Sequence, residues 1–195
     1  MGKTSDSEMF DGSCVFIDSA TGFIHLVLQV NLNMHEMLNA IHEFKQVCHD
    51  HGVIPQLSNS DNATVFTSEG MAKKLKRFAQ IITFAGAGAH HHNGMAERAI
   101  GPITNMACTM MLHAAIHWPD ATDATQWPMA VMHATYLYNH MPHLETGISP
   151  VDLFTKMRWE QKKFHDCHVW GCPVYVLDKT LGNGKKIPKW KPRFK

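Results

Sequence analysis

The chain has 195 residues, of which 45% are hydrophobic and 18% are charged, and its formal net charge is +1. This composition excludes a disordered chain, and the length predicts one domain or one domain with an appendage. We find no apolar stretch near the ~18 residues of a membrane span and no apolar signal-peptide core. Five dispersed cysteines, an odd number, favour a reduced, intracellular protein.

The small net charge conceals two unlike parts. Residues 179–195 contain seven basic residues and no acidic one, so the rest of the chain is acidic, with 11 basic and 17 acidic residues. A basic tail on an acidic body allows an interaction with phosphates that the total charge does not indicate. The tail can equally be a solvated end, and composition alone leaves both interpretations open.

The first half of the chain predicts strands and helices in alternation. Two β-prone stretches, 13–18 and 23–30, are separated by a turn at 19–22 and predict an antiparallel hairpin. Asn33 is placed to cap a helix from Met34 to about Asp50, which Gly52 ends. A strand is expected at 53–57, a short helix from Ser68 and a strand at 81–84, followed by a Gly-, Ala- and His-rich loop at 85–93.

The second half is predicted to be mainly helical. A long helix begins near Asn93 or Gly94 and contains Pro102, which predicts a kink or a later start. Trp127-Pro128 and Ser149-Pro150 each predict a further helix, with Pro near its first position. From residue 169 onward, and above all at 174–177, the pattern predicts a small β module before the basic tail. The order of elements indicates an α/β protein.

Two carboxylates stand at positions where they can bind a metal ion. Asp61 follows a predicted strand, Glu97 lies at the start of the long helix, and 35 residues separate them. A Mg²⁺ ion prefers oxygen ligands, and one or two carboxylates commonly hold it together with substrate phosphates. Two such ions can activate the attacking oxygen and stabilise the leaving oxygen in phosphoryl transfer. On spacing alone, a turn Asp and a Glu that complements the helix dipole explain the pair better.

The residues around these carboxylates resemble a known family. Ser60-Asp61-Asn62 and the stretch from His91 to Arg98 resemble the second-aspartate and glutamate segments of retroviral and retrotransposon integrases, and the 35-residue spacing matches. Further segments resemble integrases of copia-type retrotransposons: Trp118-Pro119, Trp127-Pro128, residues 136–142, Ser149-Pro150 and residues 170–176. The resemblance covers residues 12–195.

The resemblance implies a ribonuclease-H-like fold, in which helices flank a five-stranded mixed sheet, followed by a small SH3-like β module. We expect a polar leader at 1–11, the catalytic core at 12–158 and the module with its basic tail at 159–195. It also implies a metal-dependent polynucleotidyl transferase in which three carboxylates hold two Mg²⁺ or Mn²⁺ ions. Carried over by position, Asp61 is the second carboxylate and Glu97 the third, both as catalytic metal ligands.

The sequence departs from the family at several positions. The family carries its first catalytic Asp on a strand that precedes residues 14–18, and we expect this chain to lack that strand. Asp18 is expected to cap the following turn, and Asp6 and Asp11 lie in the polar leader. Ala63, His92 and Pro102 also replace what the family pattern leads us to expect. We therefore expect an integrase fragment or decayed copy without strand-transfer activity of its own.

Two histidine-rich stretches have alternative explanations. His90, His91 and His92 can bind a metal, but their place before Glu97 favours a loop near DNA. His165, Cys167, His168 and Cys172 can form a zinc site, although their spacing is not that of a zinc finger. Residues expected to contact nucleic acid flank the carboxylates or lie in the tail: Asn62, His91, His92, Asn93, Arg98, Lys185, Lys186, Lys189, Lys191 and Arg193.

The function expected from the resemblance is DNA integration as part of a copia-type Pol polyprotein. The expected partners are the DNA of the element ends and of the target, the rest of the polyprotein and further copies of the chain, but no membrane. An intracellular place, in the nucleus or a virus-like particle, is implied by the family. The alternative is a non-catalytic nucleic-acid-binding or assembly module that retains the fold.

Overall fold

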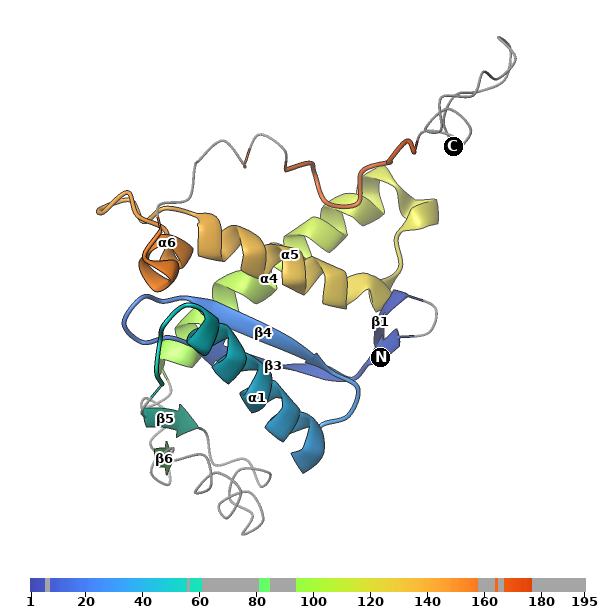
Figure 1. Ribbon diagram of the computed structural model, residues 1–195. Coiled ribbons are helices and arrows are strands. Elements are labelled where there is room, and N and C mark those ends of the chain that lie inside the picture. Colours follow the sequence, from blue (N-terminus) through green and yellow to red (C-terminus); the bar gives the residue numbers. More distant parts are fainter. Residues whose placement is uncertain are drawn as a thin grey trace, which may run out of the picture.

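The computed structural model describes residues 1–5, 8–55, 57–60, 81–84, 94–157, 164 and 167–176 (Figure 1). The predicted helix from Ser68 and the predicted loop at 85–93 lie outside the described residues. So does the basic tail.

The centre of the fold is the hairpin of β3 (Gly12–Ile17) and β4 (Ile24–Gln29), which pair antiparallel in register from Gly12 with Gln29 to Ile17 with Ile24. The predicted hairpin is therefore confirmed. Its turn is closed by Asp18, whose backbone carbonyl accepts a hydrogen bond from the Gly22 N–H at 2.8 Å. Gly22 has φ +72°, a left-handed conformation that glycine adopts without steric cost.

Helix α1 (Met34–Asp50) follows the hairpin, with the start and the end that the sequence predicts. The Asn33 side chain accepts a hydrogen bond from the Glu36 N–H at 2.9 Å, which satisfies one of the free donors of the first turn. The chain leaves the helix through Gly52 at φ +67°.

Helices cover both faces of the hairpin (Figure 1). Because side chains alternate along a strand, Val15 and Ile17 pack against the cluster formed with α4 and α5, whereas Phe16 packs against α1. Phe16 stacks on Phe44 with ring centroids 4.8 Å apart. The hairpin is thus the middle layer of a three-layer arrangement.

The main core lies between β4 and two long helices, α4 (Gly94–His117) and α5 (Trp127–His140). Its buried members are mostly small: Ile24, Ala99, Ile103, Ala107, Ala130 and Ala134. Alanines on facing helices allow the two backbones to approach closely. Pro102 is the ninth residue of α4, in its third turn, and the helix continues through it, although Pro has no N–H to donate to the carbonyl four residues earlier, that of Arg98.

Shorter elements complete the described chain. The helical stretches η2 (Pro119–Ala121) and η3 (Ala124–Gln126) connect α4 to α5, and α6 (Pro150–Thr155) follows α5. The Ser149 side chain caps α6, as Ser149-Pro150 predicts, by accepting from the Asp152 N–H at 3.3 Å. β1 (Gly2–Ser5) pairs with β2 (Glu8–Phe10), and β5 (Leu57–Ser60) pairs parallel with β6 (Ile81–Phe84).

The expected five-stranded sheet is not present among the described residues, whose strands form three separate two-stranded sheets. The reason lies in the pairing. β1 and β2 hydrogen-bond to each other, and β1 contacts α5 and η3, so within the described chain neither strand joins the β3–β4 hairpin to the β5–β6 pair. The leader expected to be merely polar at 1–11 thus contains strands. The strand expected at 53–57 is displaced, since β5 begins only at Leu57.

The strand expected at 174–177 is absent from its described part. Val174, Tyr175 and Val176 adopt no strand, and 64 to 76% of each is exposed. Strand propensity alone does not form a strand here, because a strand is stable only as part of a sheet. The described residues therefore give no support for the SH3-like module, whose other residues lie outside them.

One helical stretch, Ala96–His117, is long and apolar enough by composition to cross a membrane, with a mean hydropathy of 1.3. The sequence-based expectation that no apolar stretch approaches the length of a membrane span was therefore wrong for this helix. Length and composition do not separate a membrane helix from a core helix, and in this fold one face of α4 packs on β3 and α5.

Cys48 on α1 is 1% exposed, and burial, followed by the negative charge of Asp18, raises the pKa of its thiol to about 11. A pKa two units higher lowers the fraction of the reactive thiolate at pH 8 about a hundredfold. We expect iodoacetamide to label the exposed Cys108 at pH 8 and to spare Cys48 until the chain is unfolded in urea. Peptide mass spectrometry measures both rates, and equal labelling of the folded chain contradicts the prediction.

The same pKa shift predicts a loss of stability at high pH. An unfolded chain releases the Cys48 proton near pH 9, whereas the folded chain retains it to about pH 11. The contribution of the Cys48 thiol to the free energy of unfolding is therefore complete below pH 9 and is lost as the pH rises from 9 to 11. A Cys48→Ser variant should lack this part of the alkaline loss in urea unfolding.

Candidate functional site

Glu97 lies in the first turn of α4, where the carboxylate of an exposed side chain faces solvent. Within the described part of the chain it forms no hydrogen bond and no ion pair. The next residue, Arg98, is also exposed, and its Nε–H donates to the Gly94 carbonyl at 2.8 Å. The structure thus presents one free carboxylate and one cation at the beginning of the long helix.

The other predicted site residues lie outside the described residues. β5 ends at Ser60, so Asp61 comes directly after a strand, as the sequence predicts. In the view of Figure 1, β5 and β6 lie below the hairpin, toward the end of the molecule where α4 begins. The remaining predicted residues that lie outside are Asn62, His91, His92, Asn93, Lys185, Lys186, Lys189, Lys191 and Arg193.

The chemistry of Glu97 fits a divalent hard cation. A carboxylate oxygen is the ligand type that Mg²⁺ prefers, and an exposed carboxylate with no partner among the described residues is available to bind one. Among the described residues, however, no group of three or more His, Cys, Asp or Glu side chains is placed to hold a metal ion. The described chain therefore contains one candidate ligand of the expected magnesium site and not the site itself.

Asp18 is committed to its own turn. Its Oδ2 accepts hydrogen bonds from the Thr21 N–H at 2.9 Å and from the Thr21 hydroxyl at 2.6 Å. This confirms the predicted turn-capping role and removes the side chain from the candidates for the first metal-binding carboxylate. Asp18 is the sole acidic residue between β3 and β4, so the hairpin supplies no other carboxylate.

The cysteine- and histidine-rich segment gives no zinc site within the described residues. Cys167, His168 and Cys172 are described and His165 is not, and no group of three ligands forms. Gly171 instead lies against α4, where an added Cβ would come within 2.8 Å of the Ala114 Cβ. The described part of this segment therefore packs along the helix.

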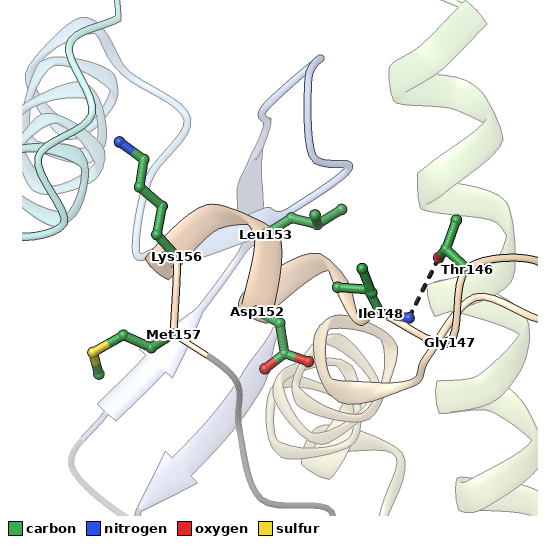
Figure 2. A pocket seen from close by; sticks show the side chains of 7 residues that line it. All are labelled: Thr146, Gly147, Ile148, Asp152, Leu153, Lys156 and Met157. Atoms are coloured by element: carbon green, nitrogen blue, oxygen red, sulfur yellow. Dashed lines mark hydrogen bonds between the residues drawn. The ribbon is translucent and has the colours of Figure 1, made fainter.

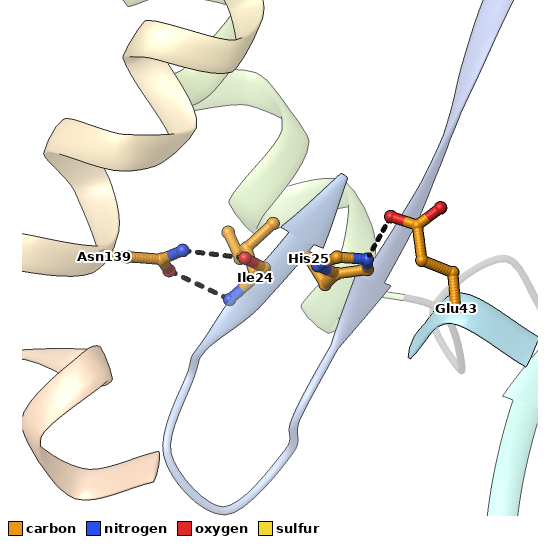
Figure 3. Close-up of polar contacts among 4 residues, drawn as sticks. All are labelled: Ile24, His25, Glu43 and Asn139. Carbon is orange, nitrogen blue, oxygen red and sulfur yellow. Dashed lines mark hydrogen bonds and ion pairs between the residues drawn. The ribbon is translucent and has the colours of Figure 1, made fainter. Parts of the chain in front are cut away.

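Asn139 is a residue whose role the sequence motif did not reveal. It is buried on α5, and its side-chain oxygen accepts from the Ile24 N–H at 2.9 Å while its amide donates to the Ile24 carbonyl at 2.7 Å (Figure 3). The side chain replaces a missing neighbouring strand for one residue of β4. It fixes α5, and with it the packing of α4, against the hairpin.

A second polar contact joins the hairpin to α1. His25 Nε2 lies 3.1 Å from Glu43 Oε1 (Figure 3). The His25 ring centroid also lies 5.8 Å from that of Phe44. Asn139 thus binds the backbone edge of β4, and the side chain of the next residue, His25, binds α1. They serve to position the layers.

A shallow pocket of about 580 Å³ lies between the segment after α5 and helix α6 (Figure 2). The carboxylate of Asp152 is already occupied at this place, since its Oδ2 accepts from the Ser149 hydroxyl at 2.7 Å. None of the predicted site residues lines it. Its lining is Thr146, Gly147, Ile148, Asp152, Leu153, Lys156 and Met157.

No protein-family model and no curated protein sequence matches this chain. Solved structures do. The HTLV-2 integrase catalytic core domain in complex with magnesium, in its dimeric form, matches 78% of this chain and 92% of its own, at 16% identity and a TM-score of 0.54. The BIV integrase catalytic core domain matches 77% of this chain and 91% of its own, at 14% identity and a TM-score of 0.53.

A simian T-cell lymphotropic virus intasome, solved in complex with the PP2A regulatory subunit B56 gamma, matches 92% of this chain and 58% of its own, at 16% identity and a TM-score of 0.57. At these identities the likeness concerns the fold. The chain has an α/β fold similar to that of the catalytic core domains of retroviral integrases.

Proposed function

We propose that this chain is the integrase-core part of a copia-type retrotransposon Pol polyprotein, in which the complete enzyme transfers DNA phosphodiesters with the help of divalent metal ions. One observation carries the proposal. In an integrase-core-like fold, a free and exposed carboxylate, Glu97, begins the long helix, and Asp61 directly follows strand β5. These are the two positions at which the sequence resembles the family.

The proposed cofactor is Mg²⁺ or Mn²⁺, held by Asp61 and Glu97. The HTLV-2 core of similar fold was solved in complex with magnesium, which supports this choice. When bound, the ions stabilise charge on the attacking and leaving oxygens. Glu97 would act as a metal ligand, and Arg98 beside it offers a cation to a DNA phosphate.

The isolated chain is proposed to lack DNA strand-transfer activity. Asp18 is bound to its own turn, β1 carries no acidic residue, and within the described chain three carboxylates do not gather. The test is incubation of the full chain with a labelled DNA end and a target plasmid in Mg²⁺ or Mn²⁺. We expect no joined product, and metal-dependent joining that Glu97→Gln abolishes would contradict this part of the proposal.

The basic tail is proposed to bind DNA phosphates. Replacing Lys185, Lys186, Lys189, Lys191 and Arg193 with Gln should weaken DNA binding and reduce the slope of log affinity against log salt by up to about 4, since each phosphate contact contributes about 0.9. Fluorescence anisotropy at several salt concentrations measures both. Lys3→Gln, Lys45→Gln and Lys156→Gln together form a control that removes three positive charges elsewhere, so the loss of affinity is compared per charge removed. An equal loss in that control would contradict a specific role of the tail.

The second candidate is a nucleic-acid-binding or assembly module without catalysis. It is favoured by the lack of a three-ligand group within the described chain. The two candidates differ in metal binding, because only the first requires that Asp61 and Glu97 bind Mn²⁺ together. DNA binding that is independent of metal, with no Mn²⁺ bound at these carboxylates, would favour the second.

The remaining proposals concern partners and place. Element-end and target DNA, further copies of the chain and the rest of the polyprotein are the proposed partners. The similar structures support the first two, since one is an intasome and others were solved as dimeric and trimeric forms. An intracellular place, in the nucleus or a virus-like particle, follows from the proposed function.

A further inference from the structure

Two histidines form an exposed pair near the end of α4. His113 and His117 are four residues apart, so both project from the same side of the helix. Their ring centroids are 4.2 Å apart, with 40° between the ring planes. Both side chains are exposed, and the proposed function uses neither of them.

The pair has the sequence spacing of a two-ligand chelate on one helix, i and i+4. Neutral imidazole nitrogens are good ligands for Zn²⁺, Cu²⁺ and Ni²⁺, and two histidines at this spacing supply two ligands from one face of a helix in known zinc sites. A bound cation would take one nitrogen lone pair from each ring.

A third aromatic ring borders the pair. The ring centroid of Trp118 lies 5.9 Å from that of His113 and 5.8 Å from that of His117. Trp118 is half-buried, and its backbone N–H donates to the Ala114 carbonyl at 2.7 Å. The indole therefore closes one side of the pair and leaves the other side open to water.

The pair is separate from the proposed magnesium site. Sixteen residues of helix separate Glu97 from His113, about 24 Å along the axis at 1.5 Å per residue. The ligand types also differ, since Mg²⁺ prefers oxygen and binds imidazole poorly. Because no group of three ligands forms within the described chain, water would complete the coordination of a metal at this pair.

We propose that His113 and His117 form a two-ligand site for a divalent transition-metal cation of the Zn²⁺ or Cu²⁺ type. The site is open, so the cation exchanges with solution and can accept a further ligand from a bound molecule. It does not depend on the proposed integrase function, and its failure leaves that function untouched.

The experiment uses the full chain with His90, His91 and His92 replaced by Gln, which removes the other run of adjacent histidines. Cu²⁺ is titrated while tryptophan fluorescence is recorded, because bound Cu²⁺ quenches a nearby indole. Zn²⁺ binding is measured by calorimetry. We expect a site whose affinity falls about tenfold or more in His113→Ala and in His117→Ala, since loss of a direct ligand costs at least as much as loss of an outer partner.

The matched control keeps the number of histidines and changes their geometry. In the double variant His117→Ala with Ala115→His, the second ring moves off the shared face, so the affinity should fall as in His117→Ala alone. Trp118→Phe should remove most of the quenching while calorimetry still detects Zn²⁺. Circular dichroism verifies that the exposed substitutions leave the fold intact. Equal affinity in the two alanine variants and their parent, or full affinity in the displaced-histidine variant, would overturn the proposal.

Discussion

Replacing Glu97 with glutamine should lower the Mn²⁺ affinity of this chain by about tenfold or more, and Asp61→Asn should do the same. The proposed site holds a hard cation through carboxylate oxygens, and an amide oxygen lacks the charge that makes these ligands strong. Losing a direct ligand is expected to cost at least the ten- to hundredfold that loss of an outer partner costs. Calorimetry or electron paramagnetic resonance of free Mn²⁺ measures the change.

A matched control comes from the first turn of α1. Glu36 lies in the first turn of its helix, as Glu97 does in α4, so Glu36→Gln removes a similar favourable interaction with the helix dipole. This variant should bind Mn²⁺ as the unchanged chain does. The double variant of Asp61 and Glu97 should lose little more than either single variant, because ligands of one ion are not independent. Equal affinities in all variants would remove the metal site from the proposed function.

Asn139→Ala should destabilise the folded chain by about 2–5 kcal/mol. The Asn139 side chain satisfies both the N–H and the carbonyl of Ile24, and Ile24 is only 1% exposed. Each buried backbone group left without a partner costs about 1–3 kcal/mol. Asn139→Asp should be at least as harmful, because the carboxylate loses the donor and brings a charge into a buried place.

Urea unfolding followed by circular dichroism measures the free energy, and Asn105→Ala provides the control. Asn105 is exposed on α4, and its replacement should change stability by only a few tenths of a kcal/mol through helix propensity. A loss below about 1 kcal/mol in Asn139→Ala would show that water replaces the side chain easily. The Ile24 contact would then not be what fixes α5 on the hairpin.

The sequence predicted the helix ends and the turn of the hairpin well, because these depend on residues close together in the chain. The ends of α1 are set by Asn33 and Gly52, Ser149 caps α6, and the turn at Asp18 joins the two expected strands. Each of these depends on hydrogen bonds or backbone angles within a few residues. The same reasoning identified Asp18 as a turn residue, which the two contacts with Thr21 confirm.

Pairing between distant strands was predicted less well. The expected five-stranded sheet would need a strand that joins the hairpin to the parallel pair, and a local pattern of apolar residues cannot specify which strands meet. β1 pairs with β2 within the described chain, and the apolar run at Val174 to Val176 remains exposed. Strand propensity shows that a segment fits a sheet, while its partner comes from the rest of the fold.

For the candidate site, too, some properties follow from the sequence and others only from the tertiary structure. The sequence itself supplied Asp61, Glu97, their spacing and the acidic body with its basic tail, because these are properties of residue type and order. Tertiary structure decided that Glu97 is exposed with no partner among the described residues, and that Asn139 joins α5 to Ile24 over 115 residues. Burial and contact arise only when distant segments pack, so no local pattern can determine them.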